Sequence, residues 1–292
     1  MVEGVRGGIV EARHLAHAVA VADGTVVASA GDPELVAYFR SAAKPIQALP
    51  LVRARPDVEE VEIAIACASH LARPEQVAAA RSLLAKAPAL EAELECGPDP
   101  TPLEHNCSGK HAGMLALCRA RGWESEGYRL AGHPCQQAML AEVAAAAEVE
   151  PSSIPIAVDG CGVVTFGLTL EHMAHAFSRL ERLEGGDLVA RAMRAHPELI
   201  RGPGSPDTEL MQLLPGWAAK GGAEALLCAV SGEGLGVALK VEDGGGRAVR
   251  PALASFLELL GIATGELGVV PVTTSRGEVV GEIRPAARGS TG

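Results

Sequence analysis

Lysine and asparagine are scarce in this sequence. Its 292 residues include twenty arginines, but a single asparagine, Asn106, and five lysines: Lys44, Lys86, Lys110, Lys220 and Lys240. Arginine therefore fills most of the positively charged surface positions. A lysine that persists is a candidate for chemistry that needs an amine able to become neutral, which a guanidinium cannot supply.

Long apolar runs and an excess of basic residues are also missing. No apolar run approaches the ~18 residues of a membrane span, although 48% of the residues are hydrophobic. A net charge of −11 argues against a general nucleic-acid-binding protein, which would show a basic patch. The opening segment MVEGVRGGIVEARH carries charges and has no apolar segment typical of a signal peptide. We therefore expect a cytoplasmic protein.

The seven cysteines show no C-x-x-C spacing. An odd number of cysteines without a secretory signal favours reduced thiols over a disulfide framework. Most of these cysteines are expected to be small buried apolar residues, so any metal ligand or nucleophile among them must be argued singly.

The apolar pattern predicts hairpins near both ends of the chain and helices between them. Alternating apolar runs surround turns at Asp23–Gly24, within 16–31, and at Gly232–Gly234, within 225–244. Further strands are predicted at 61–69, 154–160 and, as strand or coil, 277–285. Helices are predicted at 41–55, 73–88, 108–121, 133–149, 169–183, 186–196 and 247–261. This order favours an α+β fold in which helices cover an antiparallel sheet.

Ser41 and Lys44 form an S-x-x-K pair at the start of a predicted helix. One helical turn would bring the lysine amine near the serine hydroxyl, as a nucleophile and its base require. The amine must be neutral for this role, which burial or a second cation would favour. Such a pair arises easily by chance, and the alternative is a helix-capping serine with a solvated lysine.

Two further segments offer partners for this pair. Ser69 and His70 lie in CASHLARPE, between a predicted strand and a helix, where side chains are exposed and backbone N–H groups face anions. Lys220 precedes two glycines and partly resembles the K-[ST]-G element that accompanies S-x-x-K in penicillin-recognising enzymes. The match to K-[ST]-G is partial, because Gly221 stands at its second position. For the segment around Ser69, the alternative interpretation is a plain structural turn.

Two cysteine-containing segments suggest a metal site. In EHNCSGKHAGM, Cys107 and Lys110 lie near a predicted helix N-terminus, which stabilises a thiolate. In DGCGVVTFG, Asp159 and Cys161 follow a predicted strand. Cys107 and Cys161 would supply only half of a tetrahedral site, and a structural turn at Asp159 is the alternative. The S-G-K triplet is no P-loop, because the pattern G-x-x-x-x-G-K-[ST] is absent.

Taken together and in order, these segments resemble the class 3 (Rhizobium-type) L-asparaginases, the asparaginase II family. The resemblance extends from about residue 6 to about residue 285, and seven ordered motifs carry it: RSAAKPIQALP, CASH, NCSGKHAGM, HPCQQ, VDGCGVVTF, MRAHPELIRG and AAKGGAE.

The resemblance implies one domain over 1–292, with a fold similar to serine β-lactamases and glutaminases, usually as a homodimer. It also implies hydrolysis of asparagine to aspartate and ammonia by two serine–lysine pairs. By this resemblance the site residues are Ser41, Lys44, Ser69 and Lys220 for catalysis, Arg40, His111 and Asp159 for substrate, and Cys107, Lys110 and Cys161 for zinc. Lys240 is an alternative to Lys220, and the roles of the two serines are exchangeable.

Other functions stay open from the sequence. Glutamine is one methylene longer than asparagine, a difference worth only ~1–3 kcal/mol in discrimination, so a glutaminase is the nearest alternative. Another β-lactamase-like serine amidase, an amidase that uses Cys161 as nucleophile, and a catalytically silent zinc or amino-acid sensor are the others.

Overall fold

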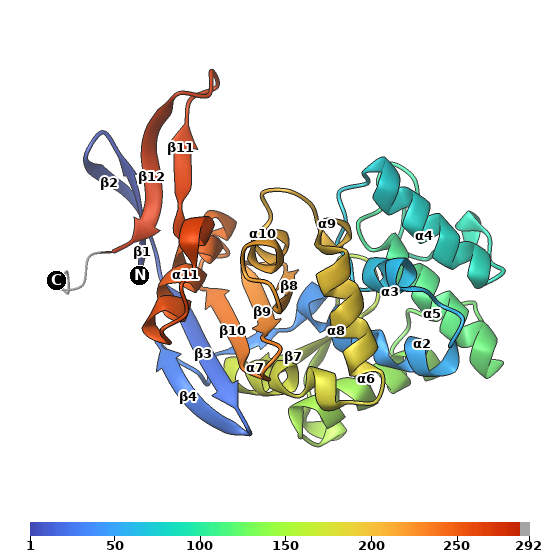
Figure 1. The fold of residues 1–292 in the computed structure, drawn as a ribbon. Helices are drawn as coiled ribbons and strands as arrows, with labels where there is room; N and C mark the ends of the chain where they lie inside the picture. Colours follow the sequence, from blue (N-terminus) through green and yellow to red (C-terminus); the bar gives the residue numbers. More distant parts are fainter. Residues whose placement is uncertain (287–292) are drawn as a thin grey trace.

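A central antiparallel sheet organises the fold, and helices pack on it and beside it. The computed structural model describes residues 1–286 of the chain, so the end of the predicted 1–292 domain lies outside the described residues. The strands are β1 Val2–Arg6, β2 Ile9–His14, β3 Ala16–Ala22, β4 Thr25–Ala30, β5 Val36–Tyr38, β6 Ile156–Val158, β7 Val164–Thr169, β8 Ala218–Gly222, β9 Leu226–Val230, β10 Gly236–Val241, β11 Val270–Thr273 and β12 Val279–Pro285. Figure 1 shows the strands on one side of the molecule and most helices on the other. The predicted α+β class is confirmed.

Both predicted hairpins are present and belong to one sheet. Its strand order is β4-β3-β10-β9-β8, so the N-terminal and C-terminal hairpins join through the antiparallel β3–β10 pair. Asp23 and Gly24, which connect β3 to β4, both have positive φ (45° and 75°), as a tight hairpin turn requires. Strand β8 lies at the edge of this sheet, facing the helical part of the molecule.

The helices occupy nearly all the predicted ranges. They are α1 Lys44–Gln47, α2 Leu49–Ala54, α3 Glu60–Ala66, α4 Pro74–Lys86, α5 Ser108–Arg121, α6 Pro134–Ala147, α7 Leu170–Ser178, α8 Gly186–Ala195, α9 Pro197–Ile200, α10 Pro206–Leu213 and α11 Val249–Leu259. Short 3₁₀ turns are η1 Arg40–Ala43, η2 Glu91–Glu93, η3 Pro151–Ser153, η4 Leu180–Arg182, η5 Gly246–Ala248 and η6 Gly265–Gly268. Helix α5 ends where predicted, because Gly122 adopts the left-handed conformation that caps it.

The strand predicted at 61–69 is wrong, since these residues contribute to helix α3. Val61, Ile63 and Ile65 alternate as in a strand, but α3 is packed against α4, α5 and α8 and is buried on most sides. A helix buried on most sides loses the 3.6-residue apolar period that identifies it. A capping box between Glu59 and Glu62 starts the helix. Ser69 therefore follows a helix, not a strand.

The helix predicted at 41–55 is divided into η1, α1 and α2. Pro45 and Pro50 each lie in the first turn of a helical piece, where the missing N–H removes no intrahelical bond. Ser41 does not cap the helix as the sequence suggested; the residues at the N-cap positions are Phe39 and Ala43, without side-chain caps. Ser41 is thereby left free for another role.

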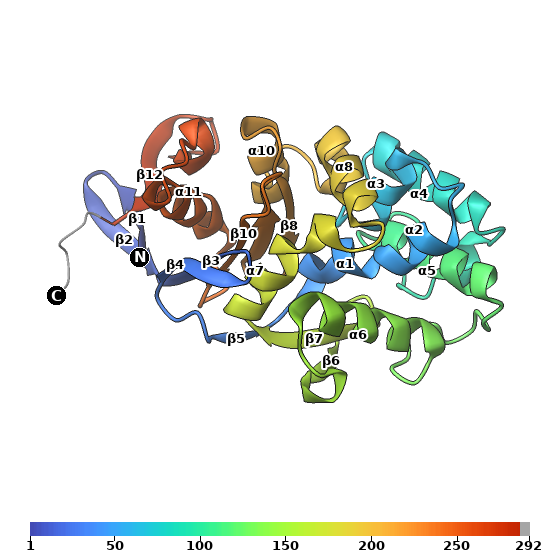
Figure 2. The same cartoon turned by 60° about the horizontal axis from the view of Figure 1, so that its bottom comes forward.

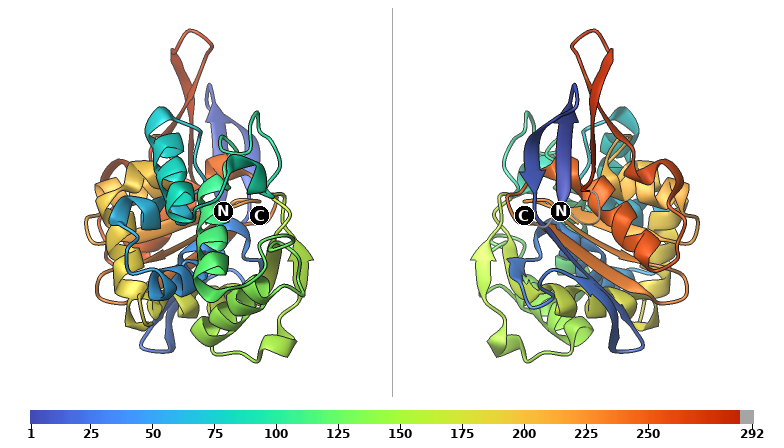
Figure 3. Two further views of the ribbon diagram at one scale, coloured as in Figure 1. Left: turned by 90° about the vertical axis from the view of Figure 1, so that its right-hand side faces the viewer. Right: turned by 90° about the vertical axis from the view of Figure 1, so that its left-hand side faces the viewer.

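Two smaller sheets complete the fold. A four-stranded sheet of order β11-β12-β1-β2 projects from the body (Figure 3), and a three-stranded sheet of order β5-β7-β6 lies beside α6 (Figure 2). Helices α7 and α11 both contact β3 and β10 of the central sheet. No helix within residues 1–286 combines the length and apolar character needed to cross a membrane.

Replacing Gly109 with alanine is expected to destabilise the protein by about 2 kcal/mol or more, because it forces overpacking. A Cβ on this α5 residue would lie 2.1 Å from the carbonyl oxygen of Ile65 in α3. The same change on an exposed helix would stabilise it by up to about 1 kcal/mol. Denaturant unfolding of Gly109→Ala and of Gly132→Ala, where a Cβ meets nothing within 4 Å, checks this. Equal stability of the two variants would refute the close α3–α5 packing.

Candidate active site

An open pocket of about 520 Å³ lies between the edge strand β8 and the helical body. We call it the serine pocket, because both predicted serines line it. Its polar lining includes Ser41, Ser69, Asn106, Arg201, Ser205 and Asp207, with the glycines of the K-G-G segment on β8.

The buried amine of Lys44 contacts Ser69 rather than Ser41. Its Nζ donates to Ser69 Oγ at 2.9 Å and to the carbonyl of Ala68, and lies 3.2 Å from Cys107 Sγ. Ser41 is half-buried at the pocket wall, and no hydrogen bond of its hydroxyl occurs within residues 1–286. The contact that the S-x-x-K spacing suggested is therefore not formed directly, because the lysine side chain extends toward the end of α3.

The backbone holds both serines in place. Ser69 N–H donates to the Ile200 carbonyl at 2.7 Å. Arg40, directly before Ser41, has φ of 50°, a left-handed conformation that is strained for a residue with a side chain, and its N–H donates to Thr165 Oγ1 at 3.0 Å. Strained backbone of this kind is common where a side chain must be presented to a ligand.

Lys220 is fully buried beside Asp207, a residue that the sequence analysis missed. Lys220 Nζ donates to the Gly221 carbonyl at 2.7 Å and lies 3.4 Å from Asp207 Oδ2. Burial lowers the pKa of Lys220 to about 8, Asp207 opposes this shift, and the positive charges of Lys44 and Arg201 add to it. Lys220 is therefore close enough to Lys44 for the two charges to interact.

Lys240, the alternative second lysine, is not among the residues that line the serine pocket. It is on β10, and its amine donates to the backbone carbonyls of Val241 and Glu242. The amine of Lys220, unlike that of Lys240, contacts two residues that line the pocket, Asp207 and Gly221.

Close packing explains why glycines follow Lys220. A Cβ on Gly221 would lie 3.2 Å from Asp207 Oδ2, and one on Gly222 would lie 3.2 Å from the Phe39 carbonyl oxygen. Asp207 Oδ2 also accepts the Gly221 N–H at 3.0 Å. In the K-[ST]-G pattern the second residue carries a hydroxyl; here a buried carboxylate occupies that space. Asp207 could have been suspected only from its position at a helix start after MRAHPELIRG.

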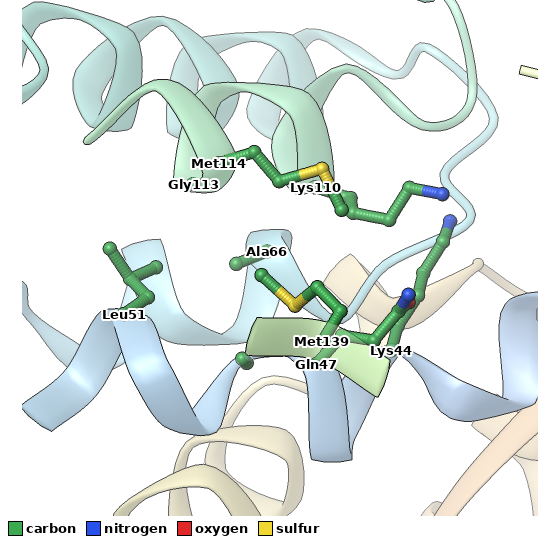
Figure 4. Close-up of a pocket in the computed structure, with 9 residues that line it drawn as sticks. Lys44, Gln47, Leu51, Ala66, Lys110, Gly113, Met114 and Met139 are labelled. Carbon is green, nitrogen blue, oxygen red and sulfur yellow. The ribbon is translucent and has the colours of Figure 1, made fainter. Parts of the chain in front are cut away.

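The three predicted metal ligands lie together, in what we call the Cys–Lys cluster: Cys107, Lys110 and Cys161. Lys110 Nζ donates to Cys161 Sγ at 3.1 Å, and Cys107 and Cys161 are close enough to shift each other's pKa. In Figure 4 the side chains of Lys44, from α1, and Lys110, from α5, run along one side of a small internal pocket with their amines toward each other.

The electrostatics of the cluster favour one thiolate. The hydrogen bond from Cys161 holds the pKa of Cys107 well below its usual range, against the effect of burial and with help from Lys44 and Lys110. That same hydrogen bond and burial raise the pKa of Cys161. Burial lowers the pKa of Lys110, but Cys161, Cys107 and Asp159 outweigh it, so the net shift is upward.

The donor set of the Cys–Lys cluster is compatible with a soft metal ion. Two sulfurs and an amine nitrogen converge, and thiolates and nitrogen are the ligands that zinc prefers. Across the described residues, no group of three His, Cys, Asp or Glu side chains is placed to hold a metal, so a site here depends on the lysine amine. Lys110 would have to lose its proton to bind a metal ion.

The predicted substrate contacts are divided between two places. Arg40 Nε donates to Asp159 Oδ1 at 2.8 Å, so these two residues form an ion pair with each other. His111 is buried on α5, where its Nδ1 lies 2.6 Å from the Tyr128 hydroxyl and its Nε2 has no partner within residues 1–286. Burial, followed by the charge of Lys110, holds the pKa of His111 well below its usual range. Its ring is therefore neutral.

The pocket places two serines beside buried lysines at the edge of a helix-covered sheet. Enzymes that transfer acyl groups through a hydroxyl use a serine with a lysine in this way. The profile of the L-asparaginase II family matches residues 2–285. The chain belongs to this family, which places it among the hydrolases that act on the amide of asparagine. A comparison with functionally curated proteins finds no match.

Proposed function

We propose that this protein hydrolyses L-asparagine to L-aspartate and ammonia by serine–lysine covalent catalysis. The observation that supports this best is the 2.9 Å hydrogen bond between buried Lys44 and Ser69, at the wall of a pocket that also presents the free hydroxyl of Ser41. A nucleophile and a base in such proximity are what covalent amide hydrolysis needs.

In this mechanism Ser41 is the nucleophile, because its hydroxyl is open to the pocket whereas Ser69 is buried and engaged. Ser41 Oγ attacks the side-chain amide carbon, and its proton passes through Ser69 to a neutral Lys44. The carbon–nitrogen bond then breaks, and the leaving nitrogen takes this proton to depart as ammonia. Water attacks the resulting aspartyl ester and releases aspartate, regenerating Ser41.

Lys220 keeps Lys44 neutral in this proposal. Two cations in one buried site repel each other, so a single positive charge is favoured over two. Asp207 holds the Lys220 amine in place through its buried carboxylate. Lys220 could also help to protonate the departing ammonia.

The substrate contacts that the family resemblance implies, at Arg40, His111 and Asp159, remain predictions. Asp159 suits the ammonium group of an amino acid, and Arg40 balances its charge when no substrate is present. His111 Nε2 has no partner among the described residues, so it is available to a bound ligand. The homodimer and the cytoplasmic location also remain predictions.

We assign zinc, held by Cys107, Lys110 and Cys161, a positioning role. Such an ion supplies positive charge that orients polar substrate groups, while the serines supply the nucleophile. The cluster lies directly beside the catalytic lysine, since Cys107 Sγ is 3.2 Å from Lys44 Nζ.

We expect one zinc ion per chain in the purified protein, and almost none in a Cys107→Ser, Cys161→Ser double variant, because two of three ligands are lost. Metal analysis by mass spectrometry measures this. Cys228→Ser is the matched control, since Cys228 is buried in β9 outside the cluster, and it should keep its zinc. Full zinc content in the double variant would refute the site. Chelation that raises KM and leaves kcat intact would support positioning.

An ammonia-release assay with asparagine and glutamine, with and without a chelator, tests the proposed function. Release from asparagine at the higher kcat/KM supports an asparaginase. Faster release from glutamine would identify a glutaminase. Binding of asparagine without ammonia release would identify a sensor and refute the enzyme.

A further inference from the structure

Arg201 is a charged group of the serine pocket that the proposed mechanism leaves unused. It is the second arginine of the MRAHPELIRG segment, it lines the pocket, and it is half-buried. Its guanidinium has no hydrogen-bond or ion-pair partner within residues 1–286. Its positive charge is close enough to Lys220 to affect that amine.

This lack of a partner distinguishes Arg201 from the other arginines of the described chain. Three others also lack an acceptor, namely Arg81, Arg121 and Arg276, but all three are exposed to solvent. Arg40, the arginine that the family resemblance assigns to the substrate, is already neutralised by Asp159 at 2.8 Å. A half-buried guanidinium without an acid is costly unless it faces water or binds an anion.

The backbone around Arg201 is fixed to Ser69, the proposed proton relay. The Ile200 carbonyl accepts the Ser69 N–H at 2.7 Å, and the Arg201 carbonyl accepts Gln76 Nε2 at 2.7 Å. Gly202 N–H donates to Thr208 Oγ1 at 3.1 Å. These hydrogen bonds fix the backbone on both sides of Arg201, so its side chain is the part that can still bind a ligand. An anion bound there would be placed in a defined relation to Ser69.

We propose that Arg201 binds the α-carboxylate of the substrate amino acid. This inference rests on the proposed function and adds its specificity determinant. A guanidinium offers two parallel N–H donors that match a carboxylate. The carboxylate at Arg201 would direct the side-chain amide of the amino acid toward the serines that line the same pocket. Amides without an α-carboxylate would lose this anchor.

Calorimetric binding of L-aspartate and β-alanine, which differ only by the α-carboxylate, tests this proposal. Wild-type protein should bind aspartate more tightly. Arg201→Met should weaken aspartate binding about 10- to 100-fold, the strength of a charge-assisted contact, and remove the preference over β-alanine. Arg201→Lys should restore part of it. Arg121→Met, which changes an exposed arginine without a partner, should bind aspartate as wild type does.

Each other outcome overturns the proposal. Unchanged aspartate affinity in Arg201→Met, or a loss confined to Arg40→Met, would place the carboxylate elsewhere. Equal losses for aspartate and β-alanine would show a structural role, as would a lower melting temperature that Arg201→Lys does not rescue. Failure of the wild type to bind aspartate would also refute it. The proposed function fails separately, if asparagine yields no ammonia while Arg201 still governs aspartate binding.

Discussion

Ser41→Ala is expected to lower kcat for asparagine roughly a thousandfold or more, without unfolding the protein, because it removes the attacking oxygen. The Ser41 hydroxyl lies at the wall of the serine pocket and makes no hydrogen bond within residues 1–286. Its removal therefore leaves no buried group without a hydrogen-bond partner. Steady-state ammonia release and thermal unfolding measure the two effects. Loss of the nucleophile should affect kcat and kcat/KM equally.

Two companion variants make the serine test decisive. Ser69→Ala interrupts proton transfer to Lys44 and should also lower kcat strongly, but it should leave the Ser41 hydroxyl able to form a slow covalent adduct. Ser29→Ala changes an exposed serine of β4 and should behave as wild type. A Ser41→Ala variant that keeps more than about a hundredth of the wild-type kcat would exclude Ser41 as nucleophile.

Lys220→Met is expected to lower kcat/KM at pH 7 about a hundredfold and to move its pH dependence. Burial lowers the pKa of Lys220 to about 8, so the lysine pair loses its first proton near that pH. The base must be neutral, so wild-type activity should rise with pH through an apparent pKa near 8 that belongs to the pair. Removing Lys220 removes the positive charge that disfavours a second charge on Lys44, so the rising limb should shift to higher pH.

Lys240→Met is the matched control for the pH experiment. Lys240 is the other lysine of the C-terminal hairpin region, but its amine is engaged by backbone carbonyls outside the serine pocket. Its profile should match that of the wild type. A shifted profile in Lys240→Met beside an unchanged one in Lys220→Met would show that the second catalytic lysine is Lys240.

The fold class could be predicted from the sequence because local rules decide the structure of many of its elements. The Asp23–Gly24 turn and Gly122 are positions where backbone conformation almost dictates the residue, and both elements were placed correctly. Helix α3 was missed because neighbours cover most of it and because its β-branched residues, Val61, Ile63 and Ile65, alternate by chance. Such tertiary burial is not visible in a local pattern.

The structure brings several of the predicted site residues together, but their contacts differ from those that the sequence suggested. Motif order located Lys44 and Ser69, yet a spacing of three residues suggested that Lys44 faces Ser41, whereas the structure places its amine on Ser69. Asp207 and Arg201 were not singled out, since a lone acid and one arginine among twenty carry no local signal. Their surroundings distinguish them: Asp207 is fully buried against Lys220, and the Arg201 guanidinium has no partner within residues 1–286.

The most direct test of the central claim is mass spectrometry of protein quenched during turnover of asparagine, followed by peptide mapping. We expect an aspartyl ester on the peptide that contains Ser41 in the wild type, and none on that peptide in Ser41→Ala. An ester on Ser69, or a thioester on Cys161, with ammonia release intact in Ser41→Ala, would contradict it.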